Sequence, residues 1–388
     1  MATADAEFIK QSADSFHDCM ECVHDSRMSK KVHHPLHSVL FLVVCAVLAD
    51  ADGPSDIETF GKLNIDWLSK FCDYPNGIPS HDTISRILGL VDPDEFQVGL
   101  LDWYGRLEME YAHPDCPVII AIDGKTVRGS ASLKAKGDAI HIVSAWASEY
   151  GLSLGQTRTD DKSNEINAIP DLLDNLDISG GLITADAMAC QRAIAERIID
   201  EEADYTLAVK GNQPNLELAI REYFEQQQEL ESSPLDAYSY STHSKGHGRT
   251  ETRMYHQVPL PETLTPLEED WSELKSIGQA ITLTIDRNGK ETSEVRYYIS
   301  SREADVYEFE RSVRNHWSIE SMHWVLDVAF HEDGAHIRKP HEVENMSMIR
   351  KLATSILKRD TSKGSLKGKR KKAGWNTSFL EQLLFFPA

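Results

Sequence analysis

The spacing of apolar positions divides the chain into an all-helical first part and a second part that mixes strands with helices. Up to residue 112 the apolar residues recur at helical intervals, and Ser80 in SHDTISRILGLVD is a suitable N-cap. From Cys116 onward, short β-branched runs such as CPVIIAID and GGLITAD alternate with amphipathic segments. This pattern predicts an α/β region in which strands and helices alternate.

The predicted elements after residue 112 follow a definite order. A strand ending at Asp123 precedes a two-stranded hairpin over 141–160, and helices then alternate with strands. This order fits a mixed sheet flanked by helices, and it is the order of the ribonuclease H-like fold. A later strand-rich stretch with an Arg-Asn-Gly turn predicts an inserted β-rich subdomain. The expected domains are an N-terminal helical domain over 1–112, the first part of the core over 113–235, the insertion over 236–301, closing helices of the core over 302–360 and a basic tail over 361–388.

The segment 314–333, RNHWSIESMHWVLDVAFHED, predicts a helix with an unusual polar stripe. A step of 100° per residue places four side chains within roughly 60° of one another. These are His316, Glu320, His323 and Asp327. Tryptophans and aliphatic residues take nearly every other direction, so we expect a buried helix. Because a buried carboxylate is costly without a cation or metal, Glu320 should face such a partner.

Two aspartates are the natural companions of Glu320. Asp123 and Asp186 each end a predicted apolar strand, and active sites of parallel sheets gather at the carboxyl ends of strands. A lone aspartate at a strand end is usually a turn or cap residue, but the joint pattern is stronger. Three crowded carboxylates suit Mg²⁺ or Mn²⁺. Two such ions about 3.5–4 Å apart support phosphodiester chemistry.

Three other motifs compete with this interpretation. The GKT at 124–126 lacks the earlier glycine of a P-loop, because Ile119 stands at that position. The alternative that His316, Glu320 and His323 form a zinc or di-iron helix needs no role for the aspartates. Cys19 and Cys22 have metal-ligand spacing but no second CxxC, so a helical turn is the simpler interpretation.

Charge and apolar runs limit the partners. The 388 residues carry a formal net charge of −22, so DNA binding requires local basic patches. The longest apolar run, Val39–Leu48, is too short to span a bilayer, and the first residues lack a secretory pattern. Six scattered cysteines suit a reducing cytoplasm. We expect a cytoplasmic protein with no membrane contact.

Basic residues in three places are candidates for contacts with DNA phosphates. The first group lies at predicted strand ends and the second in the β-rich stretch. The third lies in KGSLKGKRKK, whose composition predicts a flexible tail. A solvated loop or tail is the competing interpretation for each. The candidates are Lys125, Arg128, Lys210, Lys245, Arg249, Lys369, Arg370 and Lys371.

Five motifs in order resemble a known family. They are AIDGKTVRGS, KSNEINAIPDLL, LITADAMACQ, DYTLAVKGNQPNL and RNHWSIESMHWVLDVAFHED. Together they resemble the DDE transposases of bacterial insertion sequences, in the branch that includes the H-repeat-associated proteins. The likeness runs from about Asp25 to near Leu384. It implies Asp123, Asp186 and Glu320 as the catalytic, metal-holding triad. Positions that hold Tyr, Arg and Lys in the broader superfamily are here Val313, His316 and Asp327.

The resemblance also implies an activity and partners. We expect a transposase that uses two Mg²⁺ ions to cut DNA at the terminal inverted repeats and to join the 3′-hydroxyl to target DNA. It would act as a homodimer on DNA, associated with the nucleoid, with Arg314 and His316 meeting phosphates. A nuclease on the same fold and an inactive DNA-binding remnant are the alternatives.

Overall fold

The N-terminal part of the protein is helical, as the apolar spacing predicts. The computed structural model describes residues 14–107, 116–131, 139–159, 165–230, 234–246, 248–267 and 270–385. Its first helices are α2 (Leu36–Leu48), α3 (Pro54–Leu63), α4 (Ile65–Leu68), α5 (His81–Leu88) and α6 (Pro93–Leu107). The Ser80 side chain caps α5 by accepting a hydrogen bond from the Thr83 amide. Residues 38–48 of α2 are all buried, which places this helix at the centre of the helical part.

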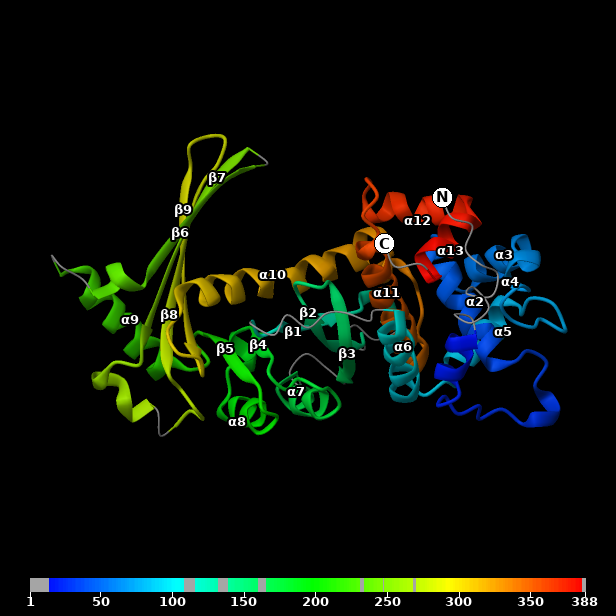
Figure 1. Cartoon of the computed structure of the whole chain (residues 1–388), viewed down its shortest axis with the longest axis horizontal. Coiled ribbons are helices and arrows are strands. Elements are labelled where there is room, and N and C mark those ends of the chain that lie inside the picture. Colours follow the sequence, from blue (N-terminus) through cyan, green and yellow to red (C-terminus); the bar gives the residue numbers. More distant parts are fainter. Residues whose placement is uncertain are drawn as a thin grey trace.

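A nine-stranded sheet follows, and its first five strands come in the order along the chain that the sequence predicts. They are β1 (Ile119–Thr126), β2 (His141–Ala147), β3 (Leu152–Thr159), β4 (Leu182–Ala185) and β5 (Asp204–Val209). The strand order begins β3-β2-β1-β4-β5. β2 is antiparallel to both of its neighbours, β1 and β3, whereas β4 and β5 run parallel to β1. The predicted mixed sheet flanked by helices is confirmed: α7 (Glu165–Asp174) and α8 (Arg192–Asp200) lie along one side (Figure 1).

The strand-rich stretch continues the same sheet instead of starting a separate one. Its strands are β6 (Ser239–Gly246), β7 (Arg249–Pro259), β8 (Ser276–Ile285) and β9 (Glu291–Ser300). β9 pairs antiparallel with β5, and the order ends β9-β8-β7-β6. Before β6 comes α9 (Pro214–Gln228). The predicted Arg-Asn-Gly turn joins β8 to β9, with Gly289 at a φ of +78°, a conformation that favours glycine.

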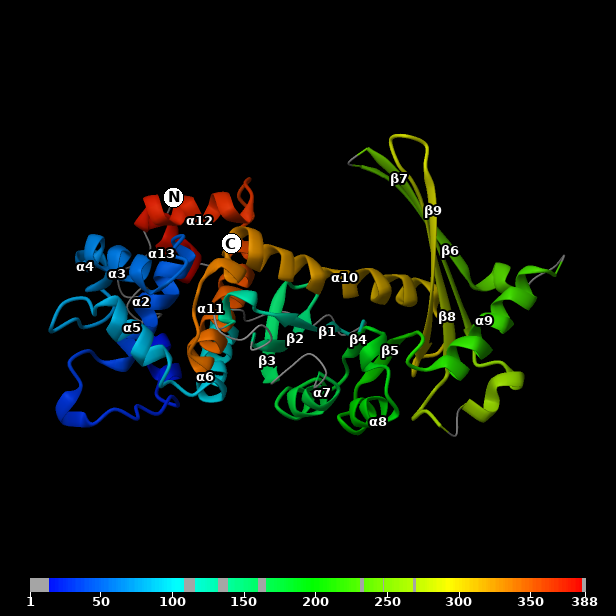
Figure 2. The ribbon, with the colours of Figure 1, turned by 180° about the vertical axis from the view of Figure 1, so that it is seen from behind.

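The helix α10 (Val306–Ala329) crosses the sheet on the side opposite α7 and α8 (Figure 2). Asp305 caps its start by accepting hydrogen bonds from the amides of Tyr307 and Glu308. The expectation that this helix is buried all round is wrong. Trp324 is 64% exposed and Val328 is 41% exposed, because the sheet and the helices near the end of the chain leave this side of α10 uncovered.

The end of the chain folds back onto the helical part. The helices α11 (Pro340–Arg359), α12 (Leu366–Trp375) and α13 (Thr377–Phe385) share one core with α2. The rings of Phe385 and Phe41 stack at 6.5 Å between centroids. The expected flexible basic tail is therefore wrong for the described residues up to 385, because apolar residues on both terminal helices are buried.

Candidate active site

The sheet offers α10 a face of small and polar side chains. Side chains alternate between the faces of a strand, and Ile120, Ile122 and Ile183 join the core formed with α7 and α8. The residues between them, which include Ala121 and Thr184, therefore face α10. Asp123 and Asp186 continue this second set, so both carboxylates lie on the α10 side of the sheet.

The two aspartates lie at neighbouring parallel strands. Ile122 of β1 pairs with Ala185 of β4, Asp123 is the next residue within β1, and Asp186 directly follows β4. The premise that these strands are neighbours is thus confirmed. The prediction that the first strand ends at Asp123 is wrong, because β1 continues to pair with β2 as far as Thr126. Asp186 also caps a short turn by accepting a hydrogen bond from the Met188 amide at 2.9 Å. This bond fixes one carboxylate oxygen at the edge of the sheet.

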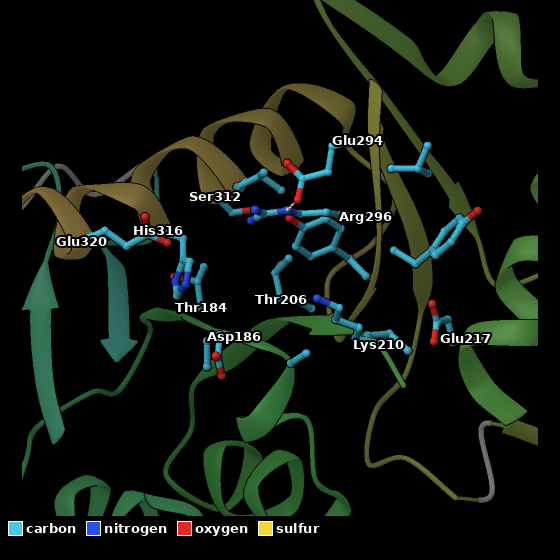
Figure 3. A pocket seen from close by; sticks show the side chains of 18 residues that line it. Thr184, Asp186, Thr206, Lys210, Glu217, Glu294, Arg296, Ser312, His316 and Glu320 are labelled. Carbon is cyan, nitrogen blue, oxygen red and sulfur yellow. Dashed lines mark hydrogen bonds and ion pairs between the residues drawn. The ribbon is translucent and has the colours of Figure 1, made fainter. Parts of the chain in front are cut away.

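The helix α10 carries the third carboxylate over the same edge. Figure 3 shows Glu320 and His316 on the helix above Asp186 and Thr184. His316 hydrogen-bonds with the Thr184 hydroxyl at 3.2 Å, and both residues line a cavity with Asp186 and Glu320. Glu320 is exposed, which differs from the buried position expected from its neighbours.

The electrostatics of the site centre on His316. Burial lowers the pKa of His316, and the charges of Asp123, Asp186 and Glu320 oppose this in part. Burial also raises the pKa of Asp186, and repulsion from Asp123 raises it further. For Asp123, burial raises the pKa, but His323, His316 and the Gly124 amide together outweigh it and the net pKa is lowered. Negative charge therefore accumulates here, as a site for a cation requires.

Two histidines of α10 lie beside these carboxylates. Nδ1 of His323 lies 3.3 Å from Oδ2 of Asp123, while His316 bonds with Thr184. Among the described residues, no three His, Cys, Asp or Glu side chains are grouped closely enough to hold a metal ion in this conformation. This applies to Asp123, Asp186 and Glu320 as much as to the zinc or di-iron set of His316, Glu320 and His323.

Lys125 is tied into an ion-pair network and does not face DNA as expected. Its ammonium lies 2.9 Å from Asp327, 3.1 Å from Glu332 and 3.2 Å from Asp333. Only 10% of its side chain is exposed, so the prediction of a phosphate contact is wrong in this conformation. Arg128 differs, because its side chain is 82% exposed.

Lys369 and Arg370 are also wrong as DNA contacts, because both are buried. Lys369 pairs with Asp360 at 3.2 Å. Arg370 pairs with Asp50 at 3.3 Å and stacks over the ring of Phe330. Six other predicted contacts are exposed in this structure and stay candidates: Arg128, Lys210, Lys245, Arg249, Arg314 and Lys371. His316 is only half-buried and hydrogen-bonds with Thr184, so its phosphate contact also stays a prediction.

Two residues near the site were not predicted from the sequence. Glu165, the first residue of α7, contacts the buried His141, and both press against Gly124 beside Asp123. The charge of Glu165 adds to the raised pKa of Asp186, in which burial is the largest cause. Arg296 of β9 lines the cavity. The motif KSNEI pointed to Glu165, whereas no sequence pattern marks Arg296.

The cysteine pair near the N-terminus, Cys19 and Cys22, is part of the local helical structure. Burial raises the pKa of Cys19 to about 12 and also raises that of Cys22. The Cys22 thiol donates to the Cys19 carbonyl at 3.1 Å. The helix over residues 14–20 ends in a turn at Cys22, so this CxxC forms a helical turn in the described part of the chain.

Comparison with known proteins identifies the class. The family described as Transposase DDE domain matches residues 114–356, and the one described as DDE_Tnp_1-associated matches residues 17–104. The chain therefore belongs to the DDE transposase family, and the resemblance seen in the sequence is confirmed. None of the described helices is long and apolar enough to cross a membrane.

Relatives in the same family are similar over nearly the whole chain. The chain is 43% identical to "Putative transposase YncI" of Escherichia coli O157:H7, over 96% of this chain and 95% of that protein. It is 40% identical to "H repeat-associated putative transposase YhhI" of Escherichia coli K12, over 93% and 95%. The cryo-EM structure of the piggyBac transposase synaptic complex with hairpin DNA aligns at a TM-score of 0.39 and 10% identity, over 99% of this chain and 80% of that one. That likeness is too weak to carry an argument.

Proposed function

We propose that this transposase cuts DNA at the ends of an insertion sequence and joins the freed 3′-hydroxyl to target DNA. The observation that carries the proposal is that Asp123 within β1, Asp186 just after the neighbouring strand β4 and Glu320 of α10 all lie near His316. The strand order β3-β2-β1-β4-β5 supports a ribonuclease H-like core interrupted by β6–β9.

The residues present fit a divalent metal by their chemistry. Three carboxylates supply oxygen-only donors, and Asp186 is held by backbone amides close to the repelling charge of Asp123. Asp123, Asp186 and Glu320 would hold the Mg²⁺ ions. When bound, such ions activate the attacking oxygen and stabilise the leaving oxygen of a phosphodiester.

The proposed reaction then consists of two displacements at phosphorus. In the first, a water oxygen bonds to phosphorus, the bond from phosphorus to the 3′-oxygen breaks, and a 3′-hydroxyl and a 5′-phosphate result. In the second, that 3′-hydroxyl attacks a target phosphodiester and releases a target 3′-hydroxyl. The protein positions both strands, with Arg128, Lys245, Arg249, Arg314 and Lys371 as phosphate contacts. Two protomers on DNA would bring two element ends together in the nucleoid.

The test is cleavage of a DNA fragment carrying the element's terminal repeat, with Mg²⁺ or Mn²⁺. Asp123→Asn should abolish cleavage and leave DNA binding largely unchanged, whereas the matched variant Asp174→Asn on α7 should cut normally. Undiminished cleavage by Asp123→Asn would remove Asp123 from the active site. A strand-transfer assay separates the transposase from a nuclease that cuts without joining, and absence of both activities would favour an inactive remnant.

A further inference from the structure

Lys125 lies two residues after Asp123 on β1, so both side chains leave the strand on the side of α10. There the ammonium of Lys125 is shared by three carboxylates. It lies 2.9 Å from Oδ1 of Asp327, 3.1 Å from Oε2 of Glu332 and 3.2 Å from Oδ1 of Asp333. Only 10% of the lysine side chain is exposed, so these ion pairs are largely shielded from the water and salt that weaken surface pairs.

The three carboxylates belong to the end of α10 and to the turn that follows it. Asp327 stands in the last turn of α10, and the short helix η7 (Glu332–Gly334) then packs against η2 (Arg128–Ser130), which follows β1. The packing is close, because a Cβ at Gly129 would lie 2.9 Å from the carbonyl oxygen of Asp333. The strand β1 and the end of α10 are therefore joined through backbone as well as side chains.

The position of Glu320 depends on this junction. Glu320 and Asp327 are seven residues apart on α10, which is about two turns and about 10 Å along one stripe of the helix. Since the helix is continuous between them, the place where Lys125 holds Asp327 also sets where Glu320 stands relative to Asp123. The same ion pair therefore links the strand and the helix that carry two of the three proposed metal ligands.

We propose that Lys125 is a positioning residue of the active site, which fixes α10 on the sheet through Asp327 and thereby places Glu320. The proposal rests on the proposed function, which gives Glu320 its role. The network is anchored on its far side by Arg350 of α11, whose Nη1 lies 3.5 Å from Oε1 of Glu332, with both side chains buried. Movement of α10 along β1 would therefore separate several buried charges at once, which is costly.

Two variants distinguish an effect of position from an effect of charge. Lys125→Met removes a cation near the carboxylates and Asp327→Asn removes an anion, so their direct electrostatic effects on Mg²⁺ binding are opposite. If the ion pair places Glu320, both variants should lower kcat for DNA cleavage at saturating Mg²⁺, by about tenfold or more, with KM for DNA unchanged. Lys125→Arg keeps the charge and should retain more activity than Lys125→Met. Asp327 is 36% exposed, so Asp327→Asn is the milder change and serves where Lys125→Met folds poorly.

Two further measurements on the full chain do not depend on cleavage. In hydrogen exchange without metal or DNA, the amides of 316–329 in α10 should exchange about tenfold faster in Lys125→Met, and faster in Asp327→Asn, while those of α8 keep the parental rate. In DNA titrations with EDTA, Lys125→Met should keep the parental slope of log K against log salt, since loss of a phosphate contact would lower that slope by about 0.9. Lys62→Met is the matched control, because it removes an exposed lysine that pairs with Glu58 on α3, and it should change none of these quantities.

The proposal is overturned if α10 exchanges at the parental rate in both variants, or if both variants cut DNA at the parental rate. Opposite changes in cleavage would show that charge and not position is responsible. Weaker DNA binding with a lower salt slope in Lys125→Met would make Lys125 a phosphate contact instead. A parent chain that does not cut DNA would overturn the proposed function, and the exchange rates would still decide whether this ion pair holds α10 on the sheet.

Discussion

Nδ1 of His323 lies 3.3 Å from Oδ2 of Asp123, so an imidazole of α10 is a polar partner of the carboxylate that β1 carries. The helix and the strand are thereby joined at the proposed active site as well as through their apolar contacts. In the proposed function, this pairing holds Asp123 in place beside Asp186.

The first prediction concerns that pair. His323→Gln and Asp123→Asn should couple by about 0.5–3 kcal/mol in a double-mutant cycle, since the two side chains are in direct contact and largely buried. Urea unfolding of the parent, both single variants and the double variant measures the coupling. Purely additive effects on the free energy of unfolding would show that the contact contributes nothing to stability.

A second prediction concerns Gly124, which follows Asp123. A Cβ at this position would meet the side chains of both His141 and Glu165. Gly124→Ala should therefore lower the free energy of unfolding by about 1–3 kcal/mol through overpacking. It should also lower cleavage activity, because the strain falls beside Asp123.

Gly105→Ala provides the control for this change. A Cβ at Gly105 in α6 meets no atom within 4 Å, so the substitution should stabilise the helix by about 0.5–1 kcal/mol. If Gly124→Ala were equally well tolerated, the close packing of His141 and Glu165 around Gly124 would be refuted.

A third prediction follows from the buried Lys351. Its ammonium donates to Ser144 and Gln156, both at 2.6 Å, and burial lowers its pKa from 10.5 to about 7. Between pH 7 and pH 8 the unfolded chain keeps this proton while the folded chain loses it. The unfolded state then binds more protons, so stability rises with pH, by about 1 kcal/mol over this interval.

Urea unfolding at pH 7.0 and 8.0, for the parent and Lys351→Met, measures this effect. The interval stays below the range where the buried thiols of Cys45 and Cys72, whose pKa values burial raises, would oppose the trend through ionisation of the unfolded chain. The difference between parent and variant cancels the titration of histidines. Equal pH dependence in both proteins would show that Lys351 keeps its proton when folded.

The fourth prediction separates two adjacent basic residues of α12. Arg370→Ala should lower the free energy of unfolding by about 3–5 kcal/mol, because it leaves Asp50 and Asp52 without their buried partner. Lys371→Ala should change stability by less than about 0.5 kcal/mol, because Lys371 is exposed.

DNA binding should show the opposite order, with Lys371→Ala weakening binding at low salt in an anisotropy titration. A large loss of stability in Lys371→Ala, or none in Arg370→Ala, would contradict the assignment of burial. The domain boundaries, the dimer on DNA and the phosphate contacts stay predictions.

Much of the fold could be predicted because its signals are local. The apolar spacing predicted the N-terminal helices, and β-branched runs predicted β1 and β4. The turn at 287–289 was predicted by its glycine. Asp186 could be placed at the end of β4 since it directly follows an apolar run, whereas β1 runs on past Asp123 to Thr126 because pairing with β2 extends it.

Burial of charge could not be predicted in the same way. KGSLKGKRKK has the composition of a solvated tail, yet Arg370 is buried because aspartates more than 300 residues earlier compensate its charge. The sequence around 314–333 suggested burial on every side, but Trp324 is exposed since no element covers that side of α10.

By itself, then, the sequence determined the kind of chemistry available: three acidic residues on two strands and one helix, in the order of the DDE family. Only the tertiary structure decided which cations are held in ion pairs and which are exposed. Lys125 is engaged by Asp327, Glu332 and Asp333, whereas Lys371 is exposed. The reason is physical: secondary structure follows from the nearest residues along the chain, whereas the partner of a charge is set by distance in space.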